Sequence, residues 1–396
     1  MPANILAIVI TGMIVNVYIP LAPSLLGAMV DYQGLDSADA GRLISYNFAG
    51  ATVATIVGAV LLARSGWKIR PTMLFSLALV AVSSPAAIWA ADDVGLQGVI
   101  RFINGVGAGL GFTVTTVAVV GSPNIERAYA FLYGNPYLVG GVGLTLLPYL
   151  YTEVGIEGAF LGMGALNFAA FALVPFFPKT LPRAKGEEVS SVTPVSQSGG
   201  ERRLLLLGSL LLATFFLHYV CNSGIWTYFE RIGVSFGMSA QESGAALGPG
   251  MGAGVLGMLL ASAMGNRVPA FWPMFWGTVV ILLSTLYLMR EPTGLAFSLS
   301  TALFSASIPF VTPYFVAELS RTIPRGLGVL AANIVTITGF SLGPYLVSLL
   351  IHDDDFIPSV LLTAVGFVAV LFLLLVYSRL SRGTISEGPT SCVDQN

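Results

Sequence analysis

The chain has 396 residues, of which 55% are hydrophobic and only 10% are charged, and its mean hydropathy is +0.82. Soluble domains carry about 25% charged residues, so this composition excludes an ordinary soluble protein. The formal net charge of −2 gives no support for nucleic-acid binding. The apolar residues occur in long uninterrupted runs, which predicts an all-α membrane protein with many spans.

Polar breaks divide the chain into twelve apolar segments. Each is long enough to cross a hydrocarbon core of about 30 Å at about 1.5 Å per residue. The segments lie at residues 4–30, 40–63, 71–91, 94–119, 127–151, 156–177, 204–229, 240–264, 269–289, 293–317, 324–350 and 356–378. No basic segment precedes the first one and its apolar run is too long for a signal peptide, so we expect it to be retained as a span.

One long polar stretch separates the sixth span from the seventh. Residues 178–203 are rich in Pro, Gly, Ser and charged side chains, a composition typical of a flexible linker. The sequence therefore predicts an N-terminal six-helix bundle at residues 1–177, this linker, a C-terminal six-helix bundle at 204–379 and a cytoplasmic tail at 380–396.

Lys and Arg are distributed unequally between the two sides of the predicted bundle. With the N-terminus in the cytoplasm, fourteen of the 18 basic residues fall on the cytoplasmic side, three fall outside and one, Arg101, lies within a span. Cytoplasmic loops of membrane proteins carry this excess of Lys and Arg. We therefore expect a multi-pass protein of the plasma membrane or inner membrane with both termini in the cytoplasm.

The two halves contain similar segments in the same order. GLDSADAG at 34–41 aligns with GMSAQESG at 237–244, and LPYL at 147–150 aligns with GPYL at 343–346. Ser239 with Glu242 has the spacing of a helix capping box. Parallel six-helix repeats are one architecture of transporters, in which the substrate site lies between the repeats near the bilayer midplane.

Residues that weaken helices occur at corresponding places in the first span of each half. Pro20 and Pro23 lie in the first span, and Asn222, Ser223 and Gly224 lie at the equivalent place in the seventh. Paired interruptions of this kind indicate a binding site between the two helices.

The loop after the second span resembles a motif of the major facilitator superfamily. LLARSGWKIR is similar to the family's GxLxDRxGRR through Arg64, Gly66 and Lys68, although Ala63 replaces the acidic residue of the motif. The resemblance extends over essentially the whole chain. It implies a twelve-helix secondary transporter that works by alternating access, with Arg64, Gly66 and Lys68 at a cytoplasmic gate. It favours the branch that contains drug and metabolite exporters, which include antiporters.

Arg101 is the only permanent charge deep within a predicted span. Placing a cation at the centre of a span costs roughly 2.5–3.5 kcal/mol, so this residue requires a role. It can bind an anionic group of a solute through its planar donor fork, modulate a proton site, or hold the carbonyl groups of a broken helix. Arg101 and Gly105 resemble the RxxxG motif of the same family, which favours a coupling role. No Asp or Glu lies deep in a span, which favours an anionic ligand.

Four residues are candidates for proton coupling. His218 lies near the middle of the seventh span, and an unperturbed histidine titrates near neutral pH, although it can equally serve as a hydrogen-bonding packing residue. Asp31 and Glu230 lie at the external ends of their spans, and Arg101 completes the set.

Amide and aromatic side chains recur along several spans and can either line a wet cavity or bond between helices. Glycines that follow Arg101, at 105, 107, 109 and 111, predict close approach of a neighbouring helix. The predicted substrate-binding set is Arg101, Asn16, Tyr18, Asn47, Asn104, Tyr137, Asn222, Trp226, Tyr314 and Asn333, with Asn135 and Tyr228 as related candidates.

The sequence contains no GxxxxGK[ST] motif, and its two His and two Cys form no pattern of metal ligands or nucleophiles. We therefore expect no enzymatic activity, cofactor, metal or nucleic acid, and a monomer whose partners are the lipid bilayer, a small organic solute and protons. Three functions remain open. They are proton-coupled efflux of an amphipathic or aromatic compound, uptake or uniport of an organic anion bound by Arg101, and a non-transporting membrane sensor.

Overall fold

The computed structural model describes residues 3–62, 68–119, 122, 125–179, 199–323 and 327–385. Over these residues the secondary structure is helical apart from isolated bridge positions at Lys68, His352 and Asp355. The N-terminal half consists of α1 (Ala3–Val15), α2 (Tyr18–Gln33), α3 (Ser37–Leu62), α4 (Ile69–Trp89), α5 (Val94–Val119), α6 (Ile125–Ala169) and the short helix η1 (Ala170–Phe176). The C-terminal half consists of α7 (Gly199–Ser235), α8 (Ala240–Met264), η2 (Gly265–Arg267), α9 (Phe271–Tyr287), η3 (Leu288–Arg290), α10 (Gly294–Thr322), α11 (Leu327–Ser348) and α12 (Ile357–Ile385).

Twelve membrane spans account for these helices. Eleven helical segments of the described residues are long and apolar enough to cross a bilayer, and the segment Phe131–Phe176 has 46 residues. That length is about 70 Å of helix, more than twice the hydrocarbon thickness. Within it Gly155 has φ 67° and ψ 179°, a conformation essentially restricted to glycine. The chain therefore turns at Gly155, and the prediction of twelve spans in two six-helix halves is confirmed.

The first span is interrupted as predicted, but the interruption lies about one helical turn before Pro20. The helix ends at Val15 and resumes at Tyr18, so the break lies at Asn16. The ring of Pro20 crowds the carbonyl of the residue four positions earlier, which is Asn16. That carbonyl instead accepts a hydrogen bond from the Ile19 backbone at 3.1 Å.

The corresponding interruption predicted in the seventh span is wrong. Helix α7 continues through Asn222, Ser223 and Gly224. The Ser223 hydroxyl donates to the Gly339 carbonyl at 2.8 Å, and a Cβ atom at Gly224 would lie 3.2 Å from the Gly343 carbonyl oxygen. The small residues therefore allow close packing of α7 against α11 and do not break the helix.

The repeat is visible in matching helix ends. Gly34 and Gly237, which align in the two halves, have φ values of 67° and 87° and follow α2 and α7, the helices that end the first span of each half. The capping box before α8 is confirmed, because the Glu242 backbone donates to Ser239 Oγ at 3.1 Å and the Ser239 backbone donates to Glu242 Oε2 at 2.8 Å. Asp36 accepts from the Asp39 backbone at 2.6 Å, as the weaker counterpart.

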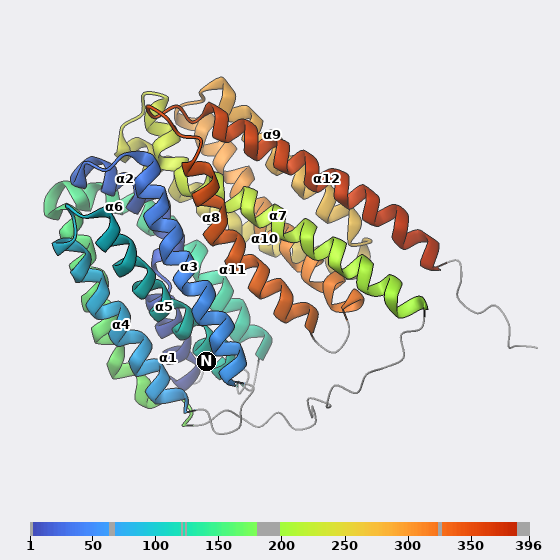
Figure 1. Cartoon of the computed structure of the whole chain (residues 1–396), viewed down its shortest axis with the longest axis horizontal. Helices are drawn as coiled ribbons and strands as arrows, with labels where there is room; N and C mark the ends of the chain where they lie inside the picture. The colour runs from blue at the N-terminus through green and yellow to red at the C-terminus, as the bar shows by residue number, and fades with distance from the viewer. Residues whose placement is uncertain are drawn as a thin grey trace, which may run out of the picture.

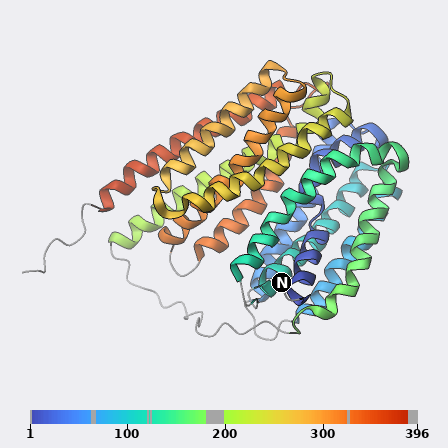
Figure 2. The same cartoon turned by 180° about the vertical axis from the view of Figure 1, so that it is seen from behind.

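The two halves lie side by side, and the pairs α2 with α7, α3 with α11 and α6 with α8 join them. Figures 1 and 2 show that the halves converge at one end of the molecule and diverge at the other. We call the end that carries the turns at Gly34 and Gly237 the converging end. The opposite end, at which the N-terminus lies, is the diverging end (Figure 1).

The glycines after Arg101 bring α5 against its neighbours, as predicted. A Cβ atom at Gly105 or Gly109 would collide with the backbone of α3, and one at Gly107 or Gly111 would collide with Ser76 of α4. The two pairs therefore occupy two faces of α5 and allow three helices to approach closely.

Candidate functional site

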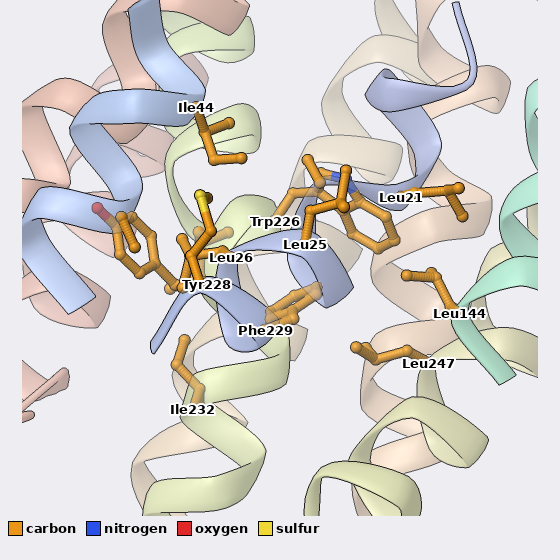
Figure 3. Close-up of a cluster of buried hydrophobic side chains, with 14 of the residues drawn as sticks. Leu21, Leu25, Leu26, Ile44, Leu144, Trp226, Tyr228, Phe229, Ile232 and Leu247 are labelled. Carbon is orange, nitrogen blue, oxygen red and sulfur yellow. The ribbon is translucent and has the colours of Figure 1, made fainter. Parts of the chain in front are cut away.

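An apolar cluster packs the two halves together toward the converging end. Figure 3 shows side chains of α2 meeting side chains of α7, with Leu144 of α6 and Leu247 of α8 beside them. The residues of this apolar seal are Leu21, Leu25, Leu26, Ile44, Leu144, Trp226, Phe229, Ile232 and Leu247, all of them buried. Burial of apolar surface on both sides closes this part of the interface to water.

Three charged residues form a cluster across the halves at the same end. Arg231 of α7 donates from Nη1 and Nη2 to the two carboxylate oxygens of Asp31 on α2, at 2.7 and 2.9 Å. It also donates from Nε and Nη2 to Glu230, at 2.7 and 2.8 Å. The Glu230 side chain is only 3% exposed and lies against Gly27 of α2, where a Cβ atom would meet its carboxylate. This charge cluster therefore depends on contact between the halves.

Polar contacts continue the closure onto α3 and α11. The Tyr228 hydroxyl donates to the Pro344 carbonyl at 3.2 Å and lies against Gly41, which leaves room for it. Ser37 at the start of α3 donates to Asp354 at 2.6 Å. These contacts and the charge cluster hold the converging end shut.

A chain of aromatic rings crosses the interface on the side of the apolar seal that faces the diverging end. Ring centroids are 6.3 Å apart for Tyr18 and Phe48, 5.6 Å for Phe48 and Phe340, and 5.6 Å for Phe340 and Tyr219. We call these four residues the aromatic bridge. They come from α2, α3, α11 and α7, so two belong to each half.

The aromatic bridge carries polar groups. The Tyr18 hydroxyl is buried and has no hydrogen-bond partner among the described residues, and the Tyr219 hydroxyl pairs with Thr312 Oγ1 at 2.9 Å. Tyr137 of α6 lies against Gly254 of α8, so it also bridges the halves. The interface therefore combines ring surfaces with hydroxyl groups.

Arg101 lies behind Tyr18, inside the N-terminal half. It is 2% exposed, and its guanidinium carbon lies 4.2 Å from the ring centroid of Phe160 and 5.7 Å from that of Tyr18. Nη2 lies 3.9 Å from Met29 Sδ, and Nε has no hydrogen-bond partner among the residues that the structure describes. None of the ion pairs found among the described residues includes Arg101. The guanidinium is therefore surrounded by aromatic rings instead of being paired with a carboxylate.

Asn47 and Asn104 form a hydrogen-bonded connection among α3, α4 and α5. Asn47 Nδ2 donates to Asn104 Oδ1 at 2.9 Å and to the Arg101 carbonyl at 3.2 Å. Asn104 Nδ2 donates to the hydroxyls of Ser83 and Ser84 at 2.9 and 3.0 Å. This geometry fits the packing alternative for the two amides.

The other predicted amides have diverse surroundings. Asn16 lies at the helix break and donates to the Gly12 carbonyl at 3.1 Å. Asn222 and Asn135 each have a buried Nδ2 for which the described residues supply no hydrogen-bond partner. Asn333 is exposed and precedes Phe340 by about two helical turns, so it shares the face of α11 that meets the other half.

The remaining aromatic candidates separate into two groups. Trp226 belongs to the apolar seal and packs edge-on against Phe229, with centroids 5.8 Å apart. Tyr314 lies within the C-terminal half, where its hydroxyl donates to the Ala261 carbonyl at 3.3 Å.

His218 is fully buried inside the C-terminal half. Its ring centroid lies 5.7 Å from that of Phe315, 5.8 Å from that of Phe367 and 5.9 Å from that of Tyr219. Neither ring nitrogen of His218 has a hydrogen-bond partner within the described ranges. The histidine thus occupies an aromatic environment, and its neighbour Tyr219 connects it to the aromatic bridge.

The predicted gate motif lies mostly outside the described residues. Arg64 and Gly66 fall in the segment 63–67, which the structure does not describe. Lys68 is exposed at the start of α4, and its carbonyl accepts a hydrogen bond from Thr72 Oγ1 at 2.8 Å.

Sequence reasoning missed Arg231, Phe48, Tyr219 and Phe340. Arg231 is one of the three basic residues counted on the external side, and Glu230 immediately before it is the one local signal of a pair. The three aromatic residues carry no polar signal in an apolar span, and no periodicity identifies which of them meet.

Comparison with known proteins gives one family. The model of the Major Facilitator Superfamily matches residues 5–328. No curated protein matches the sequence.

Several solved structures are similar in fold. The nucleoside transporter NupG has a TM-score of 0.73 at 12% identity and covers 95% of this chain and 99% of its own. A D-xylose–proton symporter has a TM-score of 0.67 at 14% identity, with 94% and 95% covered. A bacterial homologue of the human lysosomal transporter Spinster, in an inward-facing and unoccupied conformation, has a TM-score of 0.68 at 12% identity, with 98% of each chain covered. At these identities the likeness shows the fold.

Proposed function

The chain belongs to the Major Facilitator Superfamily and is a non-enzymatic, multi-pass membrane transporter of small solutes, and on this premise we propose that it exports an amphipathic or aromatic compound in exchange for protons. The observation that carries the choice of solute is the aromatic bridge. Its rings come from both halves, so a solute bound among them contacts both parts that must move relative to each other.

The proposed cycle is alternating access. Contacts at the converging end, including the apolar seal and the charge cluster, support a form that is closed there, and the halves diverge at the other end (Figure 2). With the topology predicted from the Lys and Arg distribution, the diverging end faces the cytoplasm. The solute would then enter from the cytoplasm and leave when the halves rock and the converging end opens.

The chemistry of the bridge suits a ring compound with a polar edge. Offset or edge-on aromatic pairs contribute about 0.5–1.5 kcal/mol each beyond the burial of their surface. The unpartnered hydroxyl of Tyr18 offers a hydrogen bond to a polar substituent. A neutral or weakly polar aromatic solute satisfies both features.

Replacing Phe340 with alanine is expected to weaken solute binding about 10- to 100-fold, because Phe340 contacts both Phe48 and Tyr219 in the centre of the bridge. This range corresponds to about 1.4–2.8 kcal/mol. The measurement is flux and binding of a panel of aromatic compounds with purified protein in proteoliposomes. Phe372, which is 62% exposed on α12, supplies the matched control, and Phe372→Ala should leave both unchanged.

Equal affinities for the Phe340→Ala variant and the wild type would contradict the assignment of the bridge as the solute site. An imposed pH gradient in the same vesicles tests the coupling. Flux of the wild-type protein that ignores the gradient would remove proton coupling from the proposal. A protein that binds compounds of the panel but moves none of them would support the sensor alternative.

The second candidate is transport of an organic anion bound by Arg101. The specific observation in its favour is that Arg101 Nε has no hydrogen-bond partner in the described part of the chain. Access to the guanidinium requires Tyr18 to move, since Arg101 is 2% exposed. A bidentate contact with a carboxylate would then supply the charge that the surroundings lack.

Replacing Arg101 with leucine separates a functional role from a structural one. Arg101 forms no ion pair with the described residues, so Arg101→Leu leaves no carboxylate without its partner. We therefore expect the melting temperature to change by no more than a few degrees. If Arg101 binds the solute, transport and competition by carboxylates disappear at the same time, and Arg101→Lys rescues them poorly because it lacks the planar fork. A large loss of thermal stability would instead identify Arg101 as an anchor of the helices.

A further inference from the structure

A cavity of about 170 Å³ lies at the converging end between the two halves. Its polar lining consists of Ser24, Asp31, Tyr32, Tyr151, Glu230 and Gln241. Water occupies about 30 Å³ per molecule, so the cavity has room for about five molecules or for an ion with part of its hydration shell. The cavity lies beyond the apolar seal and is distinct from the aromatic bridge.

The charge cluster beside the cavity is not neutral. When both carboxyl groups are ionised, Asp31 and Glu230 carry two negative charges. Among the described residues, Arg231 is the one basic side chain that forms an ion pair with them. The Glu230 side chain is 3% exposed and that of Arg231 is 7% exposed. A buried carboxylate is costly unless its charge is compensated, so one further positive charge is missing.

Two hydroxyl groups in the cavity wall have unmet hydrogen-bonding capacity. Within the part of the chain that the structure describes, neither Ser24 Oγ nor the Tyr151 hydroxyl has a partner with hydrogen-bond geometry, and each residue is 3% exposed. A buried polar group without a partner costs about 1–3 kcal/mol. Both hydroxyls line the same cavity as the two carboxylates, so a ligand there would satisfy the oxygen atoms and the charge together.

We propose that this cavity binds a monovalent inorganic cation, with Na⁺ as the representative ion. Carboxylate oxygens of Asp31 and Glu230, the Ser24 and Tyr151 hydroxyls and retained water supply the oxygen ligands that hard cations prefer. One positive charge makes the cluster neutral, whereas a divalent ion would leave it positive. Among the described residues no group of three or more His, Cys, Asp or Glu side chains could hold a metal ion, which also disfavours a transition metal.

The cation acts on the conformation of the transporter, an effect that rests on the proposed alternating-access cycle. Asp31 and Tyr151 belong to the N-terminal half, while Glu230 and Gln241 belong to the C-terminal half, so the cavity exists only when this end is closed. A ligand that binds only one conformation shifts the equilibrium toward it. The cation therefore stabilises the form that is closed at the converging end.

The test measures ²²Na⁺ binding and thermal stability of the full-length protein in detergent, with N-methyl-D-glucamine replacing Na⁺ at constant ionic strength. We expect saturable binding of about one ion per chain and a melting temperature that rises with Na⁺ concentration. In the Ser24→Ala/Tyr151→Phe variant the affinity should fall at least tenfold. Ser235→Ala/Tyr149→Phe changes the same residue types at exposed positions and should bind like the wild type.

Asp31→Asn provides a second variant, because it makes the cluster neutral without an ion and should abolish binding. Absence of ²²Na⁺ binding by the wild type, or unchanged affinity in both variants, overturns the proposal. Stabilisation by low pH or by methylammonium without ²²Na⁺ binding would also overturn it and would assign the missing charge to a proton or an organic ammonium group. These results do not depend on solute flux, so failure of the proposed solute transport is recognised separately.

Discussion

Arg231→Ala is expected to open the converging end of the protein. The substitution removes all four hydrogen bonds that Arg231 donates to Asp31 and Glu230. Glu230 then remains buried beneath Gly27 as an uncompensated charge, a situation that costs about 3–5 kcal/mol. Separation of the halves exposes the carboxylate to water and relieves this cost. The equilibrium should therefore shift toward opening by roughly a hundredfold to several thousandfold.

Thiol accessibility at the interface measures this opening. Leu25 is fully buried in the apolar seal, so a Leu25→Cys reporter reacts with a maleimide only when the end opens. The two native cysteines, Cys221 and Cys392, are first replaced by serine. The reporter should react far faster when it is combined with Arg231→Ala.

Two control variants accompany that experiment. Arg42 pairs with Asp39 within one half, with side chains that are 38% and 29% exposed, so Arg42→Ala should not alter the rate. The combination of Arg231→Met with Glu230→Gln removes both buried charges and should restore slow reaction. If Arg231→Ala reacts no faster than the wild type, the charge cluster does not hold the halves together.

The helices could be predicted from the sequence because their ends carry local signals. Helices α5 and α8 have the predicted bounds, 94–119 and 240–264. Before α8 the turn at Gly237 and the Ser239–Glu242 box act within a few residues, so they are readable in one stretch of chain. The unbroken α7 was missed because small polar residues weaken an isolated helix, whereas here α11 packs directly against them.

The candidate site was less predictable because it depends on which faces of distant helices meet. Asp31 and Arg231 are 200 positions apart and form the bidentate pair that joins the halves. The residue type of Asn47 predicts either a cavity-lining amide or a bond between helices, and its amide donates to Asn104 and to the Arg101 carbonyl of α5. Residue type indicates a polar contact, and only the packing decides whether the partner is a solute or a neighbouring helix.

Replacing Gly105 with valine is expected to cause the largest loss of stability among single substitutions in α5. A Cβ atom at Gly105 would collide with the carbonyl oxygen of Asn47 and lie 2.7 Å from its carbonyl carbon and 3.0 Å from the Ala51 nitrogen. These are backbone atoms of α3, so they cannot move aside as the end of a flexible side chain can. Overpacking alone typically costs 1–3 kcal/mol, and the forced separation also breaks the Asn47 hydrogen bonds to α5. We therefore expect a total loss of about 3 kcal/mol or more.

Glycine at position 162 provides the matched control, because it is helical and a Cβ atom there has no neighbour within 4 Å. Gly162→Ala should be neutral or stabilising by up to about 1 kcal/mol, since alanine favours a helix over glycine. In a thermal melt in detergent the series Gly105→Ala and Gly105→Val should lose stability progressively with side-chain size. Equal melting temperatures for the Gly105 and Gly162 variants would show that α3 and α5 are not in backbone contact. Gly105 allows α3 to approach closely enough for Asn47 to donate to the carbonyl of Arg101. The Gly105 variants should therefore also displace Arg101. The contact between α3 and α5 thus connects the glycine and the arginine of the RxxxG motif.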